Sequence, residues 1–405
     1  METTVRLNIL YTNTSYHPHV GGGAEVMLRA MAEGMAARGH RVSALVSADA
    51  DARDNVNGIE VHRLKQRNVY WSFPKEARPT WKRMLWHGID SNNLFMARPI
   101  REVMQQVKPD VVVSNNLSGL SVAVWQQAQR LGIPIVHVMH DYYLICPSVT
   151  MYKNGRICEQ ACSTCQIFRR PHAALSDKVS AVLSVSQSIL NTHLAAGIFK
   201  NTPIKRVIYN ARDLPEPAPR APLTSQQRPV VFGFIGALTE VKGIQPLIEA
   251  FVLAAQEVPG ITLLVAGTGE PGYEAQLKAL APPNVVKFLG KADAMAFFQQ
   301  IDVCIAPSQW NDPLPGVVYE SISQGVPVIG ARRGGIPEIV QDGVNGVLFD
   351  PDAPGALKAA IVNAARHPEI ISQMHTRARA SVARFVDFSA MLREHESLFK
   401  EACHV

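Results

Sequence analysis

The chain has 405 residues, of which 47% are hydrophobic and 18% are charged. This composition allows two globular domains of about 100–200 residues each and excludes a disordered chain. With 40 Lys and Arg against 34 Asp and Glu, the net charge of +6 suits a polyanionic ligand or an anionic membrane. Nucleic acid is not expected, because the basic residues are dispersed and form no zinc-finger, basic-helix or RNA-binding motif.

The start of the chain predicts a strand and no secretory leader. Residues 5–11 form a short apolar run without the features of a signal peptide. No uncharged apolar run reaches the length of about 18 residues that a membrane span requires. We therefore expect a cytoplasmic protein whose contact with the inner face of the cell membrane is peripheral.

The N-terminal half alternates strands with helices. The strand at 5–11 leads into the loop His19-Val-Gly-Gly-Gly-Ala-Glu25, followed by a helix through residue 37 and a strand at 42–47. The pattern continues with strands at 110–114, 134–139 and 179–185, a helix over 120–131, and a strand ending at residue 208. Such βαβ units predict a parallel sheet covered by helices.

Residues 213–229 mark a domain boundary, because they contain five prolines and little apolar periodicity, as linkers do. A second βαβ series follows, with strands at 230–235, 261–266, 285–289, 303–306 and 326–329. We therefore predict an α/β protein of two doubly wound, Rossmann-like domains, residues 1–212 and 230–385, facing each other across a cleft. A C-terminal helix over 386–405 is expected to pack back on the N-terminal domain. Ligands should bind in the cleft, at the carboxyl ends of the strands.

Two carboxylates separated by seven residues, Asp312 and Glu320, are candidate site residues of the second domain. Pro315 is placed like the first-turn proline of a short helix on which Glu320 is the only charge. A helix rise of about 1.5 Å per residue puts Glu320 about one turn inside a helix that starts beside Asp312. Its carboxylate can accept two hydrogen bonds from a diol such as ribose. The alternative is an ordinary solvated glutamate.

The start of the same helix is a candidate anion site. The free amides near Leu314, Gly316 and Val317 and the positive end of the helix dipole suit a diphosphate.

The Asp312/Glu320 pair resembles the signature of glycosyltransferase family 4, which usually has two glutamates at this spacing. The resemblance implies the GT-B fold and a retaining transfer from a UDP- or GDP-sugar that needs no metal for its chemistry. It assigns Asp312 to hydroxyls of the donor sugar and Glu320 to donor binding. We count both, together with His140, as catalytic candidates.

The loop Gly236-Ala-Leu-Thr-Glu-Val-Lys-Gly243 resembles the phosphate-binding loop of that family. By this resemblance Gly236 and Lys242 contact the donor diphosphate. Ala237 stands where the family often has arginine, and Arg332 or Arg333 is the alternative cation. Glycine turns at 264–270, 334–335 and 342–346 also resemble the family, and we interpret them as shaping the domain.

In the N-terminal half the resemblance points to the acceptor side and to one histidine. Gly22 and Gly23 match the family's acceptor-side glycine loop, where backbone approaches a ligand at a helix start. His140 follows the strand at 134–139 and so falls at its carboxyl end. In the family a histidine here contacts the donor sugar, while the alternative is a structural histidine.

The function expected from the resemblance is transfer of a sugar to a glycan or lipid-linked acceptor in surface polysaccharide or lipopolysaccharide assembly. Two alternatives stay open. One is a nucleotide-sugar epimerase on the same fold. The other is a non-catalytic protein that binds nucleotide sugars, which the departures at Ala237 and Asp312 allow.

Four cysteines cluster after His140 in a loop over 146–165, with eleven, three and two residues between them. Because a reducing compartment is expected, a structural zinc ion is more plausible than disulfides. An iron–sulfur cluster and free thiols are the alternatives. The ligands would be Cys146, Cys158, Cys162 and Cys165.

Residues 65–101 interleave cations with aromatic side chains, a mixture that favours a bilayer interface. The alternative is an acceptor-site flap with a partly buried aromatic cluster. The side chains are Lys65, Arg67, Lys75, Arg78, Lys82, Arg83, Arg98 and Arg101, with Tyr70, Trp71, Phe73, Trp81 and Trp86.

Overall fold

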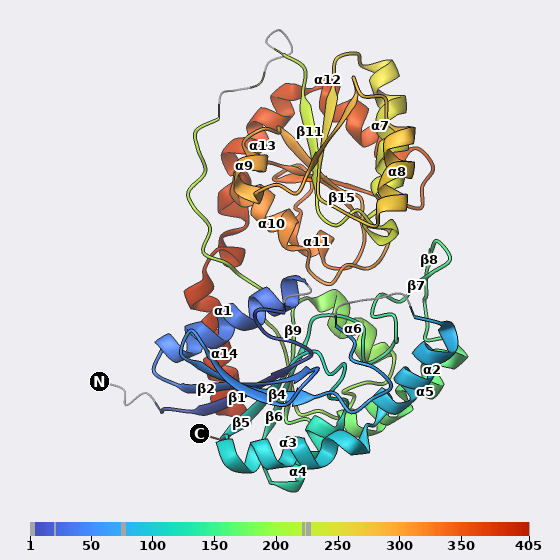
Figure 1. Ribbon diagram of the computed structural model, residues 1–405. Helices are drawn as coiled ribbons and strands as arrows, with labels where there is room; N and C mark the ends of the chain where they lie inside the picture. The colour runs from blue at the N-terminus through green and yellow to red at the C-terminus, as the bar shows by residue number, and fades with distance from the viewer. Residues whose placement is uncertain (1–4, 20–21, 74–77, 221–222, 224–227, 405) are drawn as a thin grey trace. The chain divides into compact units, whose positions relative to one another are not determined.

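The computed structural model describes residues 5–404 except 20–21, 74–77, 221–222 and 224–227 (Figure 1). The chain divides into two compact units. The first comprises Met1–Met151, Cys158–Asn210 and Ser389–Val405, and the second comprises Tyr152–Ile157 and Ala211–Phe388. Each unit is built on a mainly parallel sheet with helices on both faces (Figure 1). The prediction of two doubly wound α/β units is confirmed.

The first unit contains an eight-stranded sheet in the order β10-β9-β6-β5-β1-β2-β4-β3. All neighbours are parallel except β3, which pairs antiparallel with β4 at the edge. The strands are β1 (Asn8–Asn13), β2 (Arg41–Ala48), β3 (Ala52–Val56), β4 (Ile59–Lys65), β5 (Val111–Ser114), β6 (Ile135–Met139), β9 (Ala181–Ser184) and β10 (Ile204–Val207).

Helices cover both faces of this sheet, with α1 on one and α3 and α4 on the other (Figure 1). Its central strands are therefore buried on both sides, which is why they are continuous apolar runs with no polar alternation. The helices are α1 (Gly23–Ala37), α2 (Thr80–Ser91), α3 (Leu94–Val107), α4 (Ala123–Arg130), α5 (Ser163–Ser176), α6 (Gln187–Ala195) and α14 (Phe388–Ala402).

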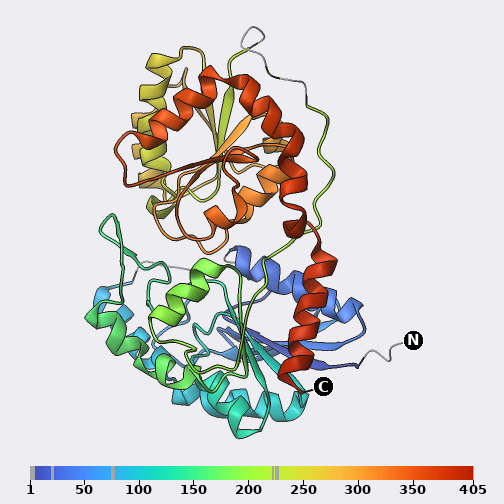
Figure 2. The ribbon, with the colours of Figure 1, turned by 180° about the vertical axis from the view of Figure 1, so that it is seen from behind.

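The last helix, α14, packs on the first unit, although it follows the second unit in sequence (Figure 2). The ring of Phe399 lies 6.4 Å from that of Tyr11 in β1. The carboxylate of Glu396 forms an ion pair with the guanidinium of Arg38 at 2.5 Å. Both an apolar contact and a charge therefore fix the helix to this unit.

The second unit contains a six-stranded, fully parallel sheet in the order β13-β12-β11-β14-β15-β16. Its strands are β11 (Val231–Ile235), β12 (Thr262–Ala266), β13 (Val286–Gly290), β14 (Val303–Ala306), β15 (Val328–Ala331) and β16 (Gly346–Phe349). Its helices are α7 (Ile244–Glu257), α8 (Pro271–Leu280), α9 (Ala294–Phe298), α10 (Gly316–Ser323), α11 (Ile336–Ile339), α12 (Ala356–Arg366) and α13 (Pro368–Ser381), with 3-10 turns at Glu240–Lys242 and Ala383–Phe385. The unit also includes the hairpin of β7 (Tyr152–Lys153) and β8 (Arg156–Ile157).

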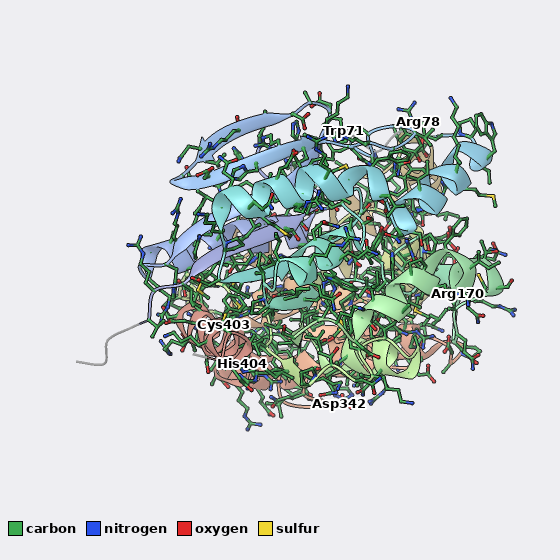
Figure 3. All side chains as sticks on the ribbon, turned by 90° about the horizontal axis from the view of Figure 1, so that it is seen from below. Trp71, Arg78, Arg170, Asp342, Cys403 and His404 are labelled. Atoms are coloured by element: carbon green, nitrogen blue, oxygen red, sulfur yellow. The ribbon has the colours of Figure 1, made fainter. Side chains whose placement is uncertain are left out.

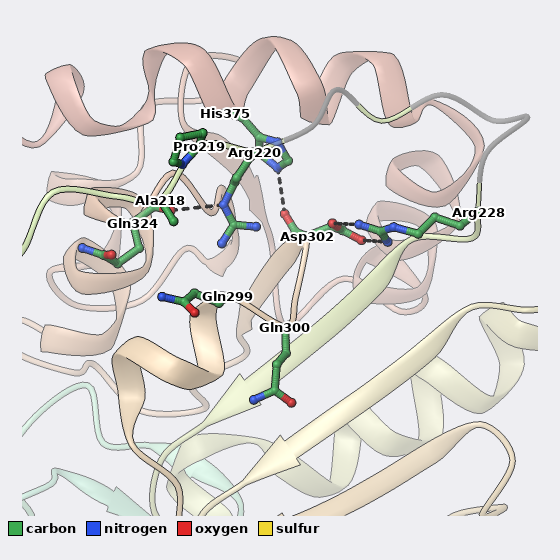
Figure 4. A pocket seen from close by; sticks show the side chains of 9 residues that line it. All are labelled: Ala218, Pro219, Arg220, Arg228, Gln299, Gln300, Asp302, Gln324 and His375. Carbon is green, nitrogen blue, oxygen red and sulfur yellow. Dashed lines mark hydrogen bonds and ion pairs between the residues drawn. The ribbon is translucent and has the colours of Figure 1, made fainter.

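The proline-rich segment, as far as the structure describes it, lies against the second unit (Figure 4). Arg228 forms two hydrogen bonds with the carboxylate of Asp302, at 2.6 and 2.7 Å. Arg220 donates to the carbonyls of Ile301, at 2.8 Å, and Gln324, at 3.2 Å. These cations line a pocket of about 290 Å³, but carboxylate or carbonyl oxygens already satisfy them. We therefore interpret the pocket as the anchor of the segment and not as a ligand site.

Among the described residues, none of the helices combines the length and the apolar character that crossing a bilayer requires.

Candidate functional site

The second sheet has its topological switch point between β11 and β14. Strand β11 pairs with β12 on one side and with β14 on the other, so the strand order reverses there. The loops that leave the carboxyl ends of β11 and β14 therefore flank a crevice, which is where open α/β sheets bind ligands. Both loops carry residues that the sequence singled out.

The loop after β11 packs tightly on the loop after β14. The amide of Gln309 donates to the carbonyl of Val241 at 2.9 Å. Gly243 has a positive φ of 73°, and a Cβ there would lie 2.0 Å from the carbonyl oxygen of Pro307. Only glycine tolerates both conditions. Gly243 therefore brings Lys242 against the loop that carries Asp312.

Lys242 and Asp312 form a direct ion pair between their Nζ and Oδ2 atoms. The carboxylate of Asp312 is 7% exposed and the side chain of Lys242 is 31% exposed. The ammonium also lies 5.7 Å from the ring centroid of Trp310. The sequence assigned both charged residues to the donor but did not predict that they pair with each other.

Two further glycine turns hold these loops by their backbones. The amide of Gly335 donates to the carbonyl of Asp312 at 2.8 Å, and a Cβ on Gly334 would lie 2.1 Å from the same oxygen. On the other side, Gly236 donates to the carbonyl of Ala266 at 3.0 Å, and a Cβ on Gly267 would lie 1.8 Å from the Gly236 oxygen. These turns keep the phosphate-loop candidate and Asp312 in place.

Helix α10 begins at Gly316, and Pro315 is its N-cap residue. The prediction that Pro315 lies in the first turn is therefore off by one residue. Pro315 has an extended ψ of 114°, which precedes the helix. No side chain caps the helix start. Gly316 and Val317 lie in the first turn, where backbone amides have no acceptor within the helix. Leu314 is buried just before them.

Glu320 is 8% exposed and does not behave as a solvated surface residue. Burial raises the pKa of its carboxyl group, and Arg212 opposes this shift. Arg212 donates to Oε1 at 2.7 Å. A Cβ on Gly316 would lie 3.2 Å from the same oxygen, so the carboxylate turns back towards the start of α10.

Sequence reasoning missed Arg212. It lies in residues 1–212, which were predicted to form the first domain, whereas the structure places it in the second unit. Its amide bonds the carbonyl of Phe385 at 3.1 Å, which fixes the segment. The sequence feature that could have indicated Arg212 is its position, because it is a cation between the last strand of the first sheet and the proline-rich segment.

In the first unit, His140 follows β6 and meets the end of β5. Its Nε2 lies 3.0 Å from Oδ1 of Asn115, whose amide nitrogen donates to the carbonyls of Thr12 and Val113 at 3.3 Å each. Burial lowers the pKa of His140 to about 4. The ring is therefore neutral at neutral pH, with Nε2 as the donor and Nδ1 as a hydrogen-bond acceptor.

Two asparagines at the carboxyl end of β5 were not predicted. Asn115 orients His140, and Asn116 donates to Oδ2 of Asp141 at 2.9 Å. Asn116 also accepts from Thr14, which follows β1, at 3.0 Å. The signal was present, because two adjacent amides directly follow an apolar strand. The ends of three neighbouring strands are thus joined by polar side chains.

The glycine-rich loop of the first unit is described only in part, because Gly21 lies outside the described residues. Gly22 is the N-cap of α1, and no side chain caps this helix start. A Cβ on Gly23 would meet no atom within 4 Å. Protein packing therefore does not require glycine at this position.

Comparisons with known proteins identify the family. Residues 229–367 match the family model described as glycosyl transferases group 1, and residues 22–210 match the glycosyl transferase 4-like domain. A Klebsiella pneumoniae protein, described as an uncharacterized 42.6 kDa protein in cps region, is 33% identical over 335 residues, which cover 82% of this chain and 87% of that protein. The chain belongs to the group 1, family-4-type glycosyltransferases.

Solved structures agree with the fold of this glycosyltransferase. The HepE protein of Anabaena in complex with UDP aligns with a TM-score of 0.73 at 22% identity, covering 97% of this chain and 99% of that one. The lipopolysaccharide outer core galactosyltransferase WaaB aligns with a TM-score of 0.64 at 15% identity, covering 97% and 99%. At these identities the likeness shows the fold.

The two arginines considered as extra phosphate cations of the glycosyltransferase each pair with an aspartate. Arg333 contacts Asp352 at 2.5 Å, and Arg332 contacts Asp342 at 3.4 Å. Neither ion pair involves Lys242 or Asp312. The role of the two arginines in phosphate binding stays a prediction.

The thiols of the glycosyltransferase are partly clustered. The Sγ atom of Cys165 lies 3.4 Å from that of Cys162 and 3.8 Å from that of Cys146. Cys158 follows the β7–β8 hairpin, and its amide bonds the carbonyl of Met151. Within the part of the chain that the structure describes, no group of three or more His, Cys, Asp or Glu side chains is arranged to hold a metal ion. The zinc hypothesis for the four cysteines stays a prediction.

Proposed function

We propose that this glycosyltransferase moves a hexose from a UDP- or GDP-sugar to a glycan or lipid-linked acceptor in the assembly of a surface polysaccharide or lipopolysaccharide. The pathway is supported by the relative named for the cps region and by the WaaB likeness. The donor class is supported by the HepE structure, which was determined with UDP. We place the reaction at the cytoplasmic face of the cell membrane.

The observation that carries the proposal is the gathering of donor-type groups at the switch point of the second sheet. The diphosphate lies against the amides of Leu314, Gly316 and Val317 at the start of α10, and against Lys242 and the Gly236 loop. The positive dipole end of α10 and the ammonium both stabilise its charge. Glu320 accepts hydrogen bonds from the ribose hydroxyls, because its carboxylate turns towards the same helix start.

The reaction is a retaining transfer that needs no metal for its chemistry. The acceptor oxygen forms a bond to the anomeric carbon on the face from which the diphosphate leaves, and the bond between that carbon and the phosphate oxygen breaks. The proton of the acceptor hydroxyl passes to a donor phosphate oxygen. Lys242 and the α10 amides stabilise the charge that develops on the leaving diphosphate.

His140 and Asp312 are assigned to the donor sugar. The neutral ring of His140 offers Nδ1 as an acceptor for a sugar hydroxyl, because its Nε2 is held by Asn115. The carboxylate of Asp312 accepts from sugar hydroxyls while Lys242 balances its charge. Gly22 and Gly23 provide the uncapped start of α1 on the acceptor side.

Turnover with a panel of UDP- and GDP-sugars tests the proposal. We expect release of nucleoside diphosphate that depends on a lipid or glycan acceptor, and loss of this release in Glu320→Ala. An altered free sugar without any acceptor would instead indicate an epimerase. Nucleotide binding without turnover would indicate a non-catalytic binding protein.

A further inference from the structure

Helix α2 exposes its apolar face and buries a charge. Trp81, Met84 and Leu85 lie on one helical face, and their side chains are 62%, 50% and 50% exposed. The opposite face buries Trp86 and Asp90. Amphipathic helices of soluble proteins normally present the reverse arrangement. The exposed face of α2 therefore needs an explanation other than packing in the core.

The buried side of α2 is firmly held, so its exposed face is not a sign of a loosely placed helix. Asp90 accepts from the amide of Gly119 at 2.8 Å and from the hydroxyl of Tyr143. The indole of Trp86 donates to the carbonyl of Tyr70 at 3.0 Å, and the two rings stack at 6.0 Å. These contacts orient α2 with Trp81, Met84 and Leu85 towards solvent.

Helix α5 packs against α2 and carries a further exposed apolar side chain. Ser91 of α2 bonds the carbonyl of Phe168, and the ring of Phe168 lies 3.7 Å from where a Cβ on Gly88 would be. The neighbouring Ile167 is 72% exposed. We name Trp81, Met84, Leu85 and Ile167 the apolar patch. Seven of the thirteen exposed large apolar side chains among the described residues fall in this patch or close to it in sequence: Val69, Trp81, Met84, Leu85, Leu94, Phe95 and Ile167.

Cations lie on the two helices that carry the apolar patch. Lys82 lies 5.5 Å from the ring of Trp81, and Arg83 is exposed on the same helix. Figure 3 labels Arg170 on α5, which packs against α2. Arg78, just before α2, lies instead over the ring of Tyr70, 5.3 Å from its centroid. The sequence of α5 contains no acid, and Asp90, the one acid of α2, is buried. The exposed charge of the two helices is therefore positive.

We propose that the apolar patch and the cations of its two helices, Lys82, Arg83 and Arg170, dock this protein on an anionic lipid bilayer. An indole beside aliphatic side chains enters the boundary between headgroups and acyl chains, while the cations contact anionic headgroups. Charge complementarity selects a lipid surface over an apolar protein partner. The inference does not depend on the transfer reaction, because vesicle binding is measured without donor or acceptor.

Sedimentation of the full chain with vesicles tests this docking. We expect binding to vesicles of mixed phosphatidylglycerol and phosphatidylcholine that is at least about tenfold stronger than binding to phosphatidylcholine alone. Raising NaCl from about 0.1 M to about 0.5 M should weaken it, because salt screens the headgroup charge. A protein that does not bind the anionic vesicles, or binds both compositions equally, would overturn the proposal.

Variants at exposed positions separate the two parts of the surface. Trp81→Ser with Leu85→Ser should weaken binding to anionic vesicles by at least about tenfold, and Lys82→Glu with Arg83→Glu should do the same. Leu253→Ser is the matched control, because Leu253 lies on α7 and is 50% exposed, like Leu85. It should leave binding unchanged.

Two other occupants would be recognised by different results. An acceptor-site flap predicts that Trp81→Ser lowers transfer to a water-soluble acceptor while vesicle binding is unchanged. A second copy of the chain predicts a dimer that Trp81→Ser dissociates, without vesicle binding by the wild type. Either result would overturn the bilayer proposal.

Discussion

Lys242 and Asp312 form an ion pair that joins the two loops at the switch point of the second sheet. Each residue comes from the carboxyl end of a different parallel strand, β11 or β14. The pair therefore places a cation beside the start of α10, where the proposed diphosphate lies. It also neutralises a carboxylate that is 7% exposed.

Replacing Lys242 by Met should lower kcat/KM by about 10²–10³-fold, because a preorganised charge on the leaving diphosphate is lost. The change also leaves Asp312 buried without its cation, which is destabilising by itself. The double variant Lys242→Met with Asp312→Asn removes that penalty and should be at least as slow, because Asp312 also contacts the donor sugar. Steady-state kinetics measure both.

Lys278→Met is the control for this prediction. Lys278 pairs with Glu274 on the exposed face of α8 and should be dispensable. Equal rates for Lys242→Met and Lys278→Met would contradict the role of Lys242.

Two glycines of the second unit form a matched pair for a stability test. Gly243 and Gly290 have similar positive φ angles of 73° and 68°. A Cβ on Gly243 would meet the Pro307 oxygen at 2.0 Å, whereas a Cβ on Gly290 would meet no atom within 4 Å. Gly290→Ala should cost about 1 kcal/mol from strain alone. Gly243→Ala should cost about 1–3 kcal/mol more and should displace Lys242.

Urea unfolding gives both free energies. If the two variants lost the same stability, the close approach of the loops at Gly243 would be wrong.

Mild acid should destabilise the first unit through its buried histidines. Burial lowers the pKa of four of its histidines to about 4: His87, His140, His193 and His395. Below about pH 6.5 the unfolded chain binds protons at these groups and the folded unit does not. The free energy of unfolding therefore decreases as the pH is lowered. Lowering the pH from 7 to 5.5 should reduce the free energy of unfolding by about 1 kcal/mol for each of these histidines.

One buried carboxyl group opposes this trend. Burial raises the pKa of Asp90 to about 6, so its stabilising effect grows as pH falls, by about 1 kcal/mol over the same range. The four histidines should outweigh it, and the melting temperature should drop from pH 7 to 5.5. His140→Gln should reduce the drop. A melting temperature independent of pH in this range would contradict the burial of these rings.

Metal analysis tests the proposal that the cysteine loop binds zinc, which the arrangement of the described side chains does not by itself show. A tetrathiolate site with Zn–S bonds of about 2.3 Å separates its sulfurs by about 3.7 Å. The two measured Sγ separations around Cys165 are 3.4 and 3.8 Å. Elemental analysis should find about one zinc per chain, lost in Cys165→Ser. Protein without stoichiometric metal would leave the cysteines as free thiols.

The strand pattern of both units was predictable because parallel strands buried on two faces are continuous apolar runs. The predicted segments at 134–139 and 303–306 correspond to β6 and β14. Strands β3, β4 and β16 were not predicted. Strand β3 is exposed and lacks such a run, and β4 mixes apolar with charged side chains. An edge strand that forms half of its hydrogen bonds with water leaves no apolar signature.

The candidate site was predictable in its residues but not in its pairings. Glycine spacing and the isolated charge of Glu320 indicated which side chains matter. The partners Arg212 and Asn115 come from 108 and 25 residues away from Glu320 and His140, respectively. Such contacts depend on how segments distant in sequence pack together, which local periodicity does not encode.

Hydrogen exchange with and without UDP or GDP tests the central claim most directly. We expect a nucleoside diphosphate to protect the amides of residues 236–243 and 314–318, which flank the switch point, and to protect them less in Lys242→Met. Protection elsewhere in the second unit, with these two loops unchanged, would contradict the donor site at the start of α10.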